Sequence, residues 1–163
     1  MRSASQQEDD AKAVGVVARP PFLFLGCLIV GFVLDRVLPL PLSLPETVLP
    51  RTTGGALIVL GAAIFAAGIR NFSRAATPVP CSRPVRTLVT SGIHGRSRNP
   101  IYVGMFLVYF GIGMAISSPW TLILTIPLAI TIRYGVVARE EAYLERRFGD
   151  DYRDYKARIR RWL

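Results

Sequence analysis

Long apolar runs constrain this 163-residue chain more than any other feature of its sequence. The run from Pro21 to Leu34 contains no charged residue, and three further runs of similar character follow it. About 20 predominantly apolar residues are enough for an α-helix to cross a bilayer, and a helix satisfies its own backbone hydrogen bonds in lipid. We therefore predict an all-α integral membrane protein. The four expected transmembrane helices cover residues 21–38, 52–69, 100–118 and 119–138.

Proline and serine residues predict how the last two of these helices are joined. Only Ser117, Ser118 and Pro119 separate them, which is too short for anything but a tight antiparallel hairpin. Pro100 fits the first turn of the third helix, where its missing N–H is not needed. Pro127 lies inside the fourth helix and is expected to kink it.

Small residues mark one face of the second predicted helix. Gly54, Gly61 and Gly68 are seven residues apart and therefore lie close to one face. Glycine at such positions lets a neighbouring helix backbone approach closely. The sequence leaves open whether that neighbour belongs to the same chain or to another copy.

The distribution of basic residues predicts the orientation in the membrane. The connector 39–51 has one lysine or arginine and the turn 117–119 has none, whereas the connector 70–98 has six and the tail from residue 139 has eight. Lysine and arginine accumulate in cytoplasmic loops. We expect a multi-pass protein of a prokaryotic inner membrane whose N- and C-termini are both cytoplasmic. Residues 1–19, polar and mixed in charge, are expected to form a disordered cytoplasmic tail.

The composition also bears on partners and chemistry. The net charge of +9 could suggest nucleic acid, but the positive charge alternates with apolar runs and so favours membrane lipids as partners, with no nucleic acid. One histidine, His94, and two isolated cysteines, Cys27 and Cys81, make neither a metal-ligand set nor a disulfide framework. We expect no metal site and no serine–histidine–aspartate triad.

Polar residues cluster at the predicted cytoplasmic end of the hairpin. Arg98 offers a forked donor, Asn99 a donor and an acceptor, and Tyr102 a phenol in the first helical turn. Glu140 and Glu141 leave the fourth helix at the same membrane surface because the hairpin is short. These residues predict a small-molecule site, although ordinary interfacial salt bridges would give the same pattern.

The C-terminal tail has a helical pattern of its own. A helix from Val136 to Phe148 is expected to end at Gly149, a common helix-stop residue. Beyond it, aromatic and apolar residues recur at helical spacing and predict an amphipathic helix that anchors at headgroup depth rather than covering a pocket. The recurring residues are Tyr152, Tyr155, Ile159 and Trp162.

Three stretches together resemble the isoprenylcysteine carboxyl methyltransferase family of integral membrane methyltransferases, whose pattern phospholipid methyltransferases share. They are Leu88–Gly104, with Arg98-Asn99-Pro100-Ile101-Tyr102-Val103-Gly104 at its end, Glu140-Glu141-Ala142-Tyr143-Leu144, and the segment from Phe148 to Lys156. The resemblance extends from about Asn71 to Leu163. It implies one membrane methyltransferase domain over residues 20–163.

The resemblance implies methyl transfer from S-adenosylmethionine to a lipophilic or membrane-associated acceptor, which enters from the lipid. A cytoplasmic connector and the tail would enclose the cofactor. Arg98 and Arg133 would hold the acceptor, whose carboxylate, thiol or amine chemistry is open. The cofactor-binding residues carried over by position are Thr77, Arg86, Thr87, Leu88, Val89, His94, Asn99, Pro100, Ile101, Tyr102, Glu140 and Glu141.

Two positions depart from the family pattern. His94 replaces the usual tyrosine, and Asn99 replaces the usual histidine and so removes an acid–base group. We assign no catalytic residue, because transfer from a sulfonium to an anionic acceptor needs mainly positioning and desolvation. Two alternatives remain open: an NADPH-dependent membrane reductase of the steroid reductase type, and a non-catalytic membrane protein with a degenerate pocket.

Overall fold

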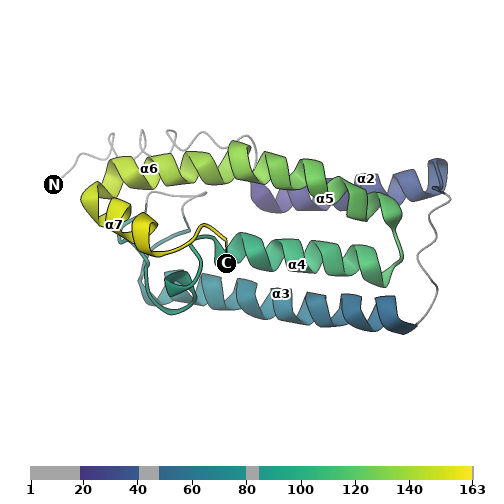
Figure 1. Cartoon of the computed structure of the whole chain (residues 1–163), viewed down its shortest axis with the longest axis horizontal. Coiled ribbons are helices and arrows are strands. Elements are labelled where there is room, and N and C mark those ends of the chain that lie inside the picture. The colour runs from purple at the N-terminus through teal and green to yellow at the C-terminus, as the bar shows by residue number, and fades with distance from the viewer. Residues whose placement is uncertain (1–18, 41–47, 80–84, 163) are drawn as a thin grey trace.

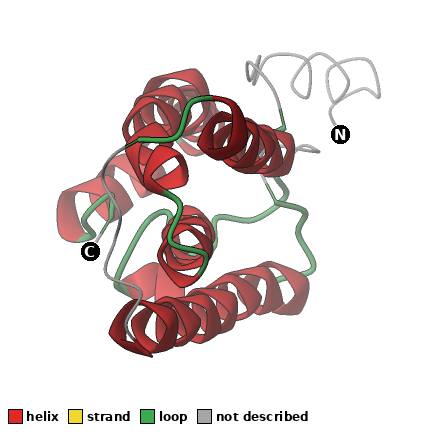
Figure 2. Cartoon of the chain, turned by 90° about the vertical axis from the view of Figure 1, so that its right-hand side faces the viewer, coloured by secondary structure: helices red, strands yellow, loops and turns green. Residues whose placement is uncertain are grey.

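The computed structural model describes residues 19–40, 48–79 and 85–162, and within them it is helical with no strand (Figures 1 and 2). The expected tail therefore lies, apart from Arg19, outside the described residues. The all-α prediction is confirmed. The elements are α2 (Pro20–Val37), α3 (Val48–Arg74), the 3₁₀ turn η1 (Gly92–Gly95), α4 (Pro100–Ala115), α5 (Pro119–Ile130), the π-helical segment η2 (Thr131–Val137), α6 (Ala138–Phe148) and α7 (Asp150–Arg158).

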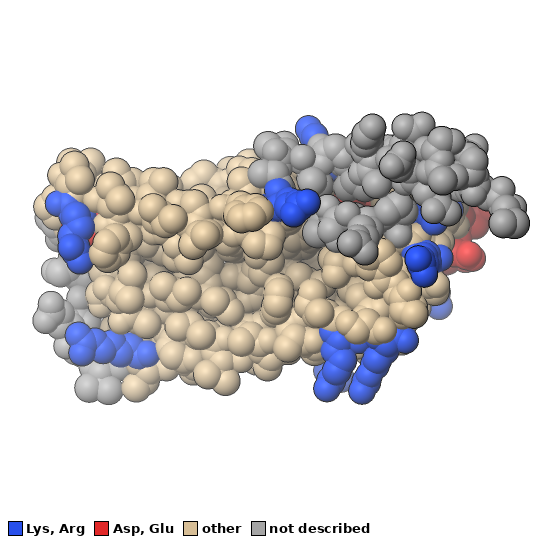
Figure 3. All heavy atoms as spheres, turned by 180° about the vertical axis from the view of Figure 1, so that it is seen from behind, with Lys and Arg blue, Asp and Glu red and all other residues tan. Residues whose placement is uncertain are grey.

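Among the described residues, three continuous helical stretches are long and apolar enough to cross a membrane. They are Pro20–Val37, Pro50–Arg74 and Pro119–Phe148, whereas α4 is apolar but has only 16 residues. The span Pro50–Arg74 is thus longer than the predicted helix 52–69. The helix α4, predicted to cover residues 100–118, ends three residues earlier, at Ala115. On the face shown in Figure 3, a wide band without charged side chains separates the basic side chains at the left end from those that begin near the middle of the long axis. This is the surface of an integral membrane protein.

The helices α3 and α4 pack closely against each other at pairs of glycines. The face of α3 that carries the spaced glycines therefore contacts a helix of the same chain. A methyl group added at Gly61 would lie 2.6 Å from the Gly104 carbonyl oxygen, and one added at Gly104 would lie equally close to the Gly61 carbonyl oxygen. The same reciprocal approach links Gly54 and Gly111. Backbone thus packs directly on backbone, as small residues permit in lipid.

A polar contact holds α2 against the hairpin at the end opposite to the N-terminus of α4. The Asp35 carboxylate accepts hydrogen bonds from the Ser118 hydroxyl and from the Trp120 backbone N–H. The Ser118 hydroxyl also accepts from the Thr121 N–H and so caps α5. Asp35 therefore ties the end of α2 to the start of α5.

The fourth span changes its helical form after Pro127. The proline lies within α5, and π-helical turns run from Thr131 to Val137 before the α-helix resumes. The kink predicted at Pro127 stays a prediction, and the observed change of helical form lies in the turns that follow the proline. A π-helical insertion changes which face of the following helix points inward, and such insertions are frequent at functional sites. In α6 that inward face carries Glu140 and Glu141.

Candidate functional site

A cavity of about 220 Å³ lies where α4 and α6 begin and α3 ends, beside the turn η1 and α7. This is the end of the bundle near the label of α7 in Figure 1. Most of the wall is apolar, and a few polar side chains converge on it, which is the usual make-up of a small-molecule site. The polar and aromatic members of the wall are Phe65, Phe72, His94, Arg98, Asn99, Tyr102, Glu140, Glu141, Tyr152 and Tyr155.

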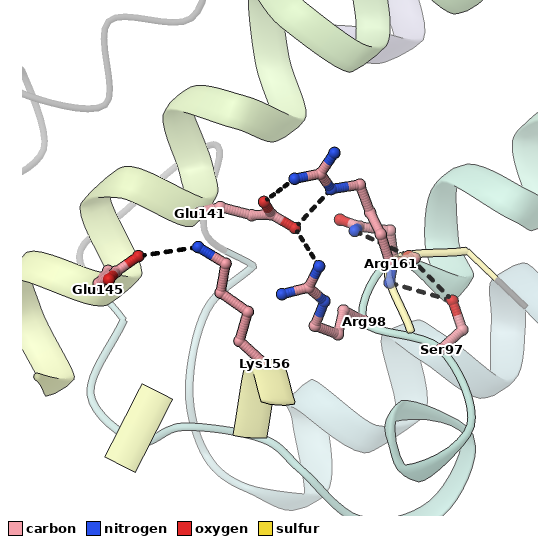
Figure 4. Close-up of polar contacts among 7 residues, drawn as sticks. Ser97, Arg98, Glu141, Glu145, Lys156 and Arg161 are labelled. Carbon is pink, nitrogen blue, oxygen red and sulfur yellow. Dashed lines mark hydrogen bonds and ion pairs between the residues drawn. The ribbon is translucent and has the colours of Figure 1, made fainter. Parts of the chain in front are cut away.

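Glu141 is the centre of a charged network (Figure 4). Its two carboxylate oxygens accept hydrogen bonds from Nε and Nη2 of Arg161 at 3.0 and 2.7 Å, and Nη2 of Arg98 lies 3.2 Å from Oε1. Bidentate pairing of this kind is the strong form of a carboxylate–guanidinium contact. The carboxylate also raises the pKa of Arg161 above its usual range. Glu141 is thereby fully engaged within the protein.

Arg98 has hydrogen-bonding capacity left over. Its side chain is only 8% exposed, and its Nε and Nη1 are buried without a hydrogen-bond partner. Buried guanidinium N–H groups are costly to leave unpaired. Because Arg98 also lines the cavity, these donors are suited to an anionic or oxygen-rich group of a ligand.

Glu140 is placed differently from its neighbour. It is 5% exposed, and its Oε1 accepts a hydrogen bond of 2.9 Å from the Tyr102 hydroxyl. No described arginine or lysine forms an ion pair with it, in contrast to Glu141. A buried carboxylate with spare acceptor capacity at a cavity wall is suited to a cationic group of a ligand.

His94 lies buried in η1 against α3 and α7. Its ring meets the Phe72 ring edge-on with centroids 4.9 Å apart, and its carbonyl oxygen accepts a 2.7 Å hydrogen bond from the Tyr155 hydroxyl. Burial lowers the pKa of His94 to about 4, so the ring is neutral at pH 7. His94 therefore adds an aromatic, uncharged wall to the cavity.

We expect His94 to make stability depend on pH. The unfolded chain takes up a proton at this residue below about pH 6.5, whereas the native state does so only near pH 4. Stability should fall between these values by at most about 1.4 kcal/mol per pH unit and should not change for this reason above pH 6.5. The measurement is the melting temperature in detergent across this range, taken as the difference from His94→Phe. Parallel curves for the two proteins would contradict the expectation.

Residues 160–162 contact the start of α4 next to the cavity. The Arg98 N–H donates to the Arg160 carbonyl at 3.0 Å, and Nδ2 of Asn99 donates to the Arg161 carbonyl at 3.1 Å. Trp162 packs against the core that includes Tyr102. Residues 160–162 therefore lie along the start of α4, far away in sequence but adjacent in space.

The aromatic face of α7 is directed into the protein. Tyr152 and Tyr155 are 1% and 4% exposed and line the cavity, so the prediction that they sit at headgroup depth is wrong. The helix also ends at Arg158, before Ile159 and Trp162. The spacing correctly predicted an amphipathic helix, but it could not distinguish a face turned to lipid from one turned to protein.

Most of the predicted site residues meet at this cavity. Its wall contains Leu88, Val89, His94, Arg98, Asn99, Pro100, Ile101, Tyr102, Glu140 and Glu141.

Four predicted residues lie outside the wall. Arg133 stacks on Tyr134 within η2, and Thr77 holds the connector by accepting hydrogen bonds from the N–H groups of Arg86 and Thr87. Thr77 thus acts on the chain just before Leu88 rather than at the cavity.

Other wall residues were not predicted as part of the site. They are Phe65, Ile69, Phe72, Val79, Val85, Met105 and Leu144, with Tyr152 and Tyr155 from α7 and Pro20 and Pro21 from α2. The two tyrosines carried a signal, because they belong to the segment from Phe148 to Lys156 that supports the resemblance. Leu144 carried one too, because it ends the stretch Glu140–Leu144 that supports the resemblance. The other apolar residues carried none, since side chains of this kind occur throughout the sequence.

Fold and site together define a membrane-embedded helical protein with a largely apolar cavity at one end of its bundle. Comparison with known proteins gives the family. Residues 49–151 match the phospholipid methyltransferase family. Mouse protein-S-isoprenylcysteine O-methyltransferase is 34% identical over 115 residues, which cover 66% of this chain and 38% of the mouse enzyme. An uncharacterized protein of Haemophilus influenzae is 35% identical over 63 residues, covering 39% of this chain and all of that protein.

The chain belongs to the phospholipid methyltransferase family of membrane proteins. The matched region begins in α3 and ends in α7, so it takes in most of the elements that build the cavity. The resemblance to membrane methyltransferases is thereby confirmed. The chain spans well under half the length of the mouse enzyme.

Proposed function

We propose that the protein transfers a methyl group from S-adenosylmethionine to a lipophilic or membrane-associated acceptor at the cytoplasmic face of the membrane. Family membership supports the reaction class. The observation that carries the choice of cofactor is the pair of unlike charges at one cavity, Arg98 with unpartnered N–H groups and Glu140 without a cationic partner. The amino-acid part of S-adenosylmethionine carries one carboxylate and one ammonium group.

The remaining wall fits the other parts of such a ligand. Val85, Leu88 and Val89 form an apolar surface suited to a nucleoside base, and they continue into the connector that Thr77 holds in place. When bound, S-adenosylmethionine supplies an electrophilic methyl group on a sulfonium. The buried tyrosines of the wall, Tyr152 and Tyr155, would exclude water, and exclusion of water strengthens each electrostatic contact in the site. Asn99 donates to the Arg161 carbonyl and so ties residues 160–162 to the start of α4 rather than acting as a base.

The acceptor would approach from the lipid. Phe65, Ile69 and Met105 belong to membrane helices and contribute to the same wall. An acceptor with an apolar chain could therefore remain in the bilayer while its polar end reaches the cavity. In this arrangement the cavity and both termini would lie on the cytoplasmic side, which is the orientation that the distribution of basic residues favours.

Calorimetric titration of the purified protein in detergent tests the proposal. We expect S-adenosylhomocysteine to bind and NADPH not to bind. Glu140→Gln should weaken S-adenosylhomocysteine binding by about tenfold or more, because a charge-assisted hydrogen bond contributes about 1.5–3 kcal/mol. Binding of NADPH alone would replace the proposal with the reductase alternative. Binding of neither compound would contradict both.

A further inference from the structure

The side-chain amide of Asn71, near the end of α3, joins the connector to the ring of His94. Its Nδ2 donates to the Ser91 carbonyl at 2.9 Å and lies 3.3 Å from Nδ1 of His94. A carbonyl oxygen can only accept a hydrogen bond, so the Asn71 atom facing Ser91 must be the NH₂ group. The second hydrogen of that group is then directed at His94 Nδ1, which must act as the acceptor.

The surrounding packing keeps the Asn71 amide in this place. Gly92 has φ +60°, and a methyl group added to it would lie 2.5 Å from Asn71 Nδ2, so the turn fits closely over the amide. On its other sides the imidazole is fixed by the Phe72 ring and through the Tyr155 hydroxyl bond to its backbone. A turned amide would place its oxygen against the Ser91 carbonyl oxygen, and a turned imidazole would lose the Asn71 contact at Nδ1.

We propose that Asn71 is a positioning residue that holds His94 in the tautomer protonated at Nε2, so that the ring offers one N–H donor to the ligand in the cavity. In the described part of the chain, Nδ1 is occupied by Asn71 and Nε2 has no hydrogen-bond partner. The low pKa keeps the ring neutral, so that only one nitrogen carries a proton. The ligand atom would be a hydrogen-bond acceptor of a nucleoside, a ring nitrogen or a hydroxyl oxygen; this part rests on the proposed function.

Nitrogen-15 NMR of the full-length protein tests the tautomer directly. His94 is the one histidine in the sequence, so histidine-selective labelling gives one pair of ring signals if the purification tag contains no histidine. At pH 7 we expect a protonated Nε2 and an unprotonated Nδ1. In Asn71→Asp the carboxylate can only accept, so Nδ1 should become protonated. Ser73→Ala, an exposed change on the same helix, should leave both signals as they are.

Each outcome bears on a separate part of the proposal. A protonated Nδ1 in the unaltered protein, or an unprotonated Nδ1 in Asn71→Asp, would overturn the role of Asn71 whatever the ligand is. Added S-adenosylhomocysteine should shift the Nε2 signal, and His94→Phe should bind it about fivefold more weakly because a neutral hydrogen bond is lost. Binding without that shift would overturn the ligand contact only. Absence of binding to the unaltered protein would instead overturn the proposed function, while the tautomer result would stand.

Discussion

Gly54→Ala should lower the stability of the protein markedly, whereas Gly55→Ala should not. A methyl group at Gly54 would lie 2.6 Å from the Gly111 carbonyl oxygen and 2.7 Å from the Ala115 nitrogen, both backbone atoms that cannot rotate away. Overpacking of this kind typically costs about 1–3 kcal/mol. A methyl group at Gly55 would meet no atom within 4 Å and should gain up to about 1 kcal/mol of helix propensity.

The adjacent pair makes a matched experiment, because both changes add one methyl group to the same turn of α3. The measurement is the melting temperature of each variant in detergent. Gly61→Ala tests the same contact nearer to the cavity, where the added methyl group would lie 2.6 Å from the Gly104 carbonyl oxygen. It should also weaken ligand binding, since Phe65 and Ile101 line the cavity from these two helices. Equal melting temperatures for Gly54→Ala and Gly55→Ala would show that the helices do not pack in this way.

The small-residue face of α3 shows which part of a helix contact can be predicted from the sequence alone. Seven-residue spacing places Gly54, Gly61 and Gly68 on one side of a helix, and this geometry is a property of the α-helix itself. Which helix lies against that side depends on Gly104 and Gly111, whose own spacing is also seven but whose pairing across the bundle is a tertiary event. The sequence could predict that a helix packs closely against this face of α3, but not that this helix is α4.

The tyrosines of α7 show a second limit. A helical spacing of aromatic residues says that one face is apolar, and lipid and protein interior are both apolar environments. In a membrane protein the hydrophobic pattern therefore carries less information about the direction of a face than it does in water. The burial of Tyr152 and Tyr155 follows from α7 folding back toward η1, where the Tyr155 hydroxyl donates to the His94 carbonyl.

The two adjacent glutamates show a third limit. The short hairpin was enough to predict that Glu140 and Glu141 reach the same membrane surface as Arg98 and Tyr102. It did not distinguish their roles, because that depends on Arg161, a residue 20 positions further along the chain. Neighbouring positions in a helix point about 100° apart, so one carboxylate meets Arg161 and the other meets Tyr102.

Glu141→Gln should therefore destabilise the protein by about 3 kcal/mol or more. The change leaves the Arg98 guanidinium, 8% exposed, with no ionised partner among the described residues, and it breaks the bidentate contact with Arg161. Removing one member of a buried ion pair is far more costly than removing an exposed one. Glu145→Gln is the matched control: it lies one turn further along α6 and pairs with Lys156 at 3.2 Å, but both side chains are partly exposed. Loss of this exposed ion pair should lower the free energy of unfolding by at most about 1 kcal/mol.

A comparison with Glu140→Gln separates a structural carboxylate from one that serves the ligand. The glutamine oxygen can still accept the Tyr102 hydrogen bond, and no ion pair is broken, so the melting temperature should change little while S-adenosylhomocysteine affinity falls. Glu141→Gln should lower the melting temperature more than it lowers the affinity for S-adenosylhomocysteine. A double-mutant cycle of Glu141→Gln with Arg161→Gln should give a coupling of more than about 1 kcal/mol, since the two side chains are in direct contact. If both glutamate variants behaved like Glu145→Gln, neither the charged network nor the ligand contact would have the importance that their burial indicates.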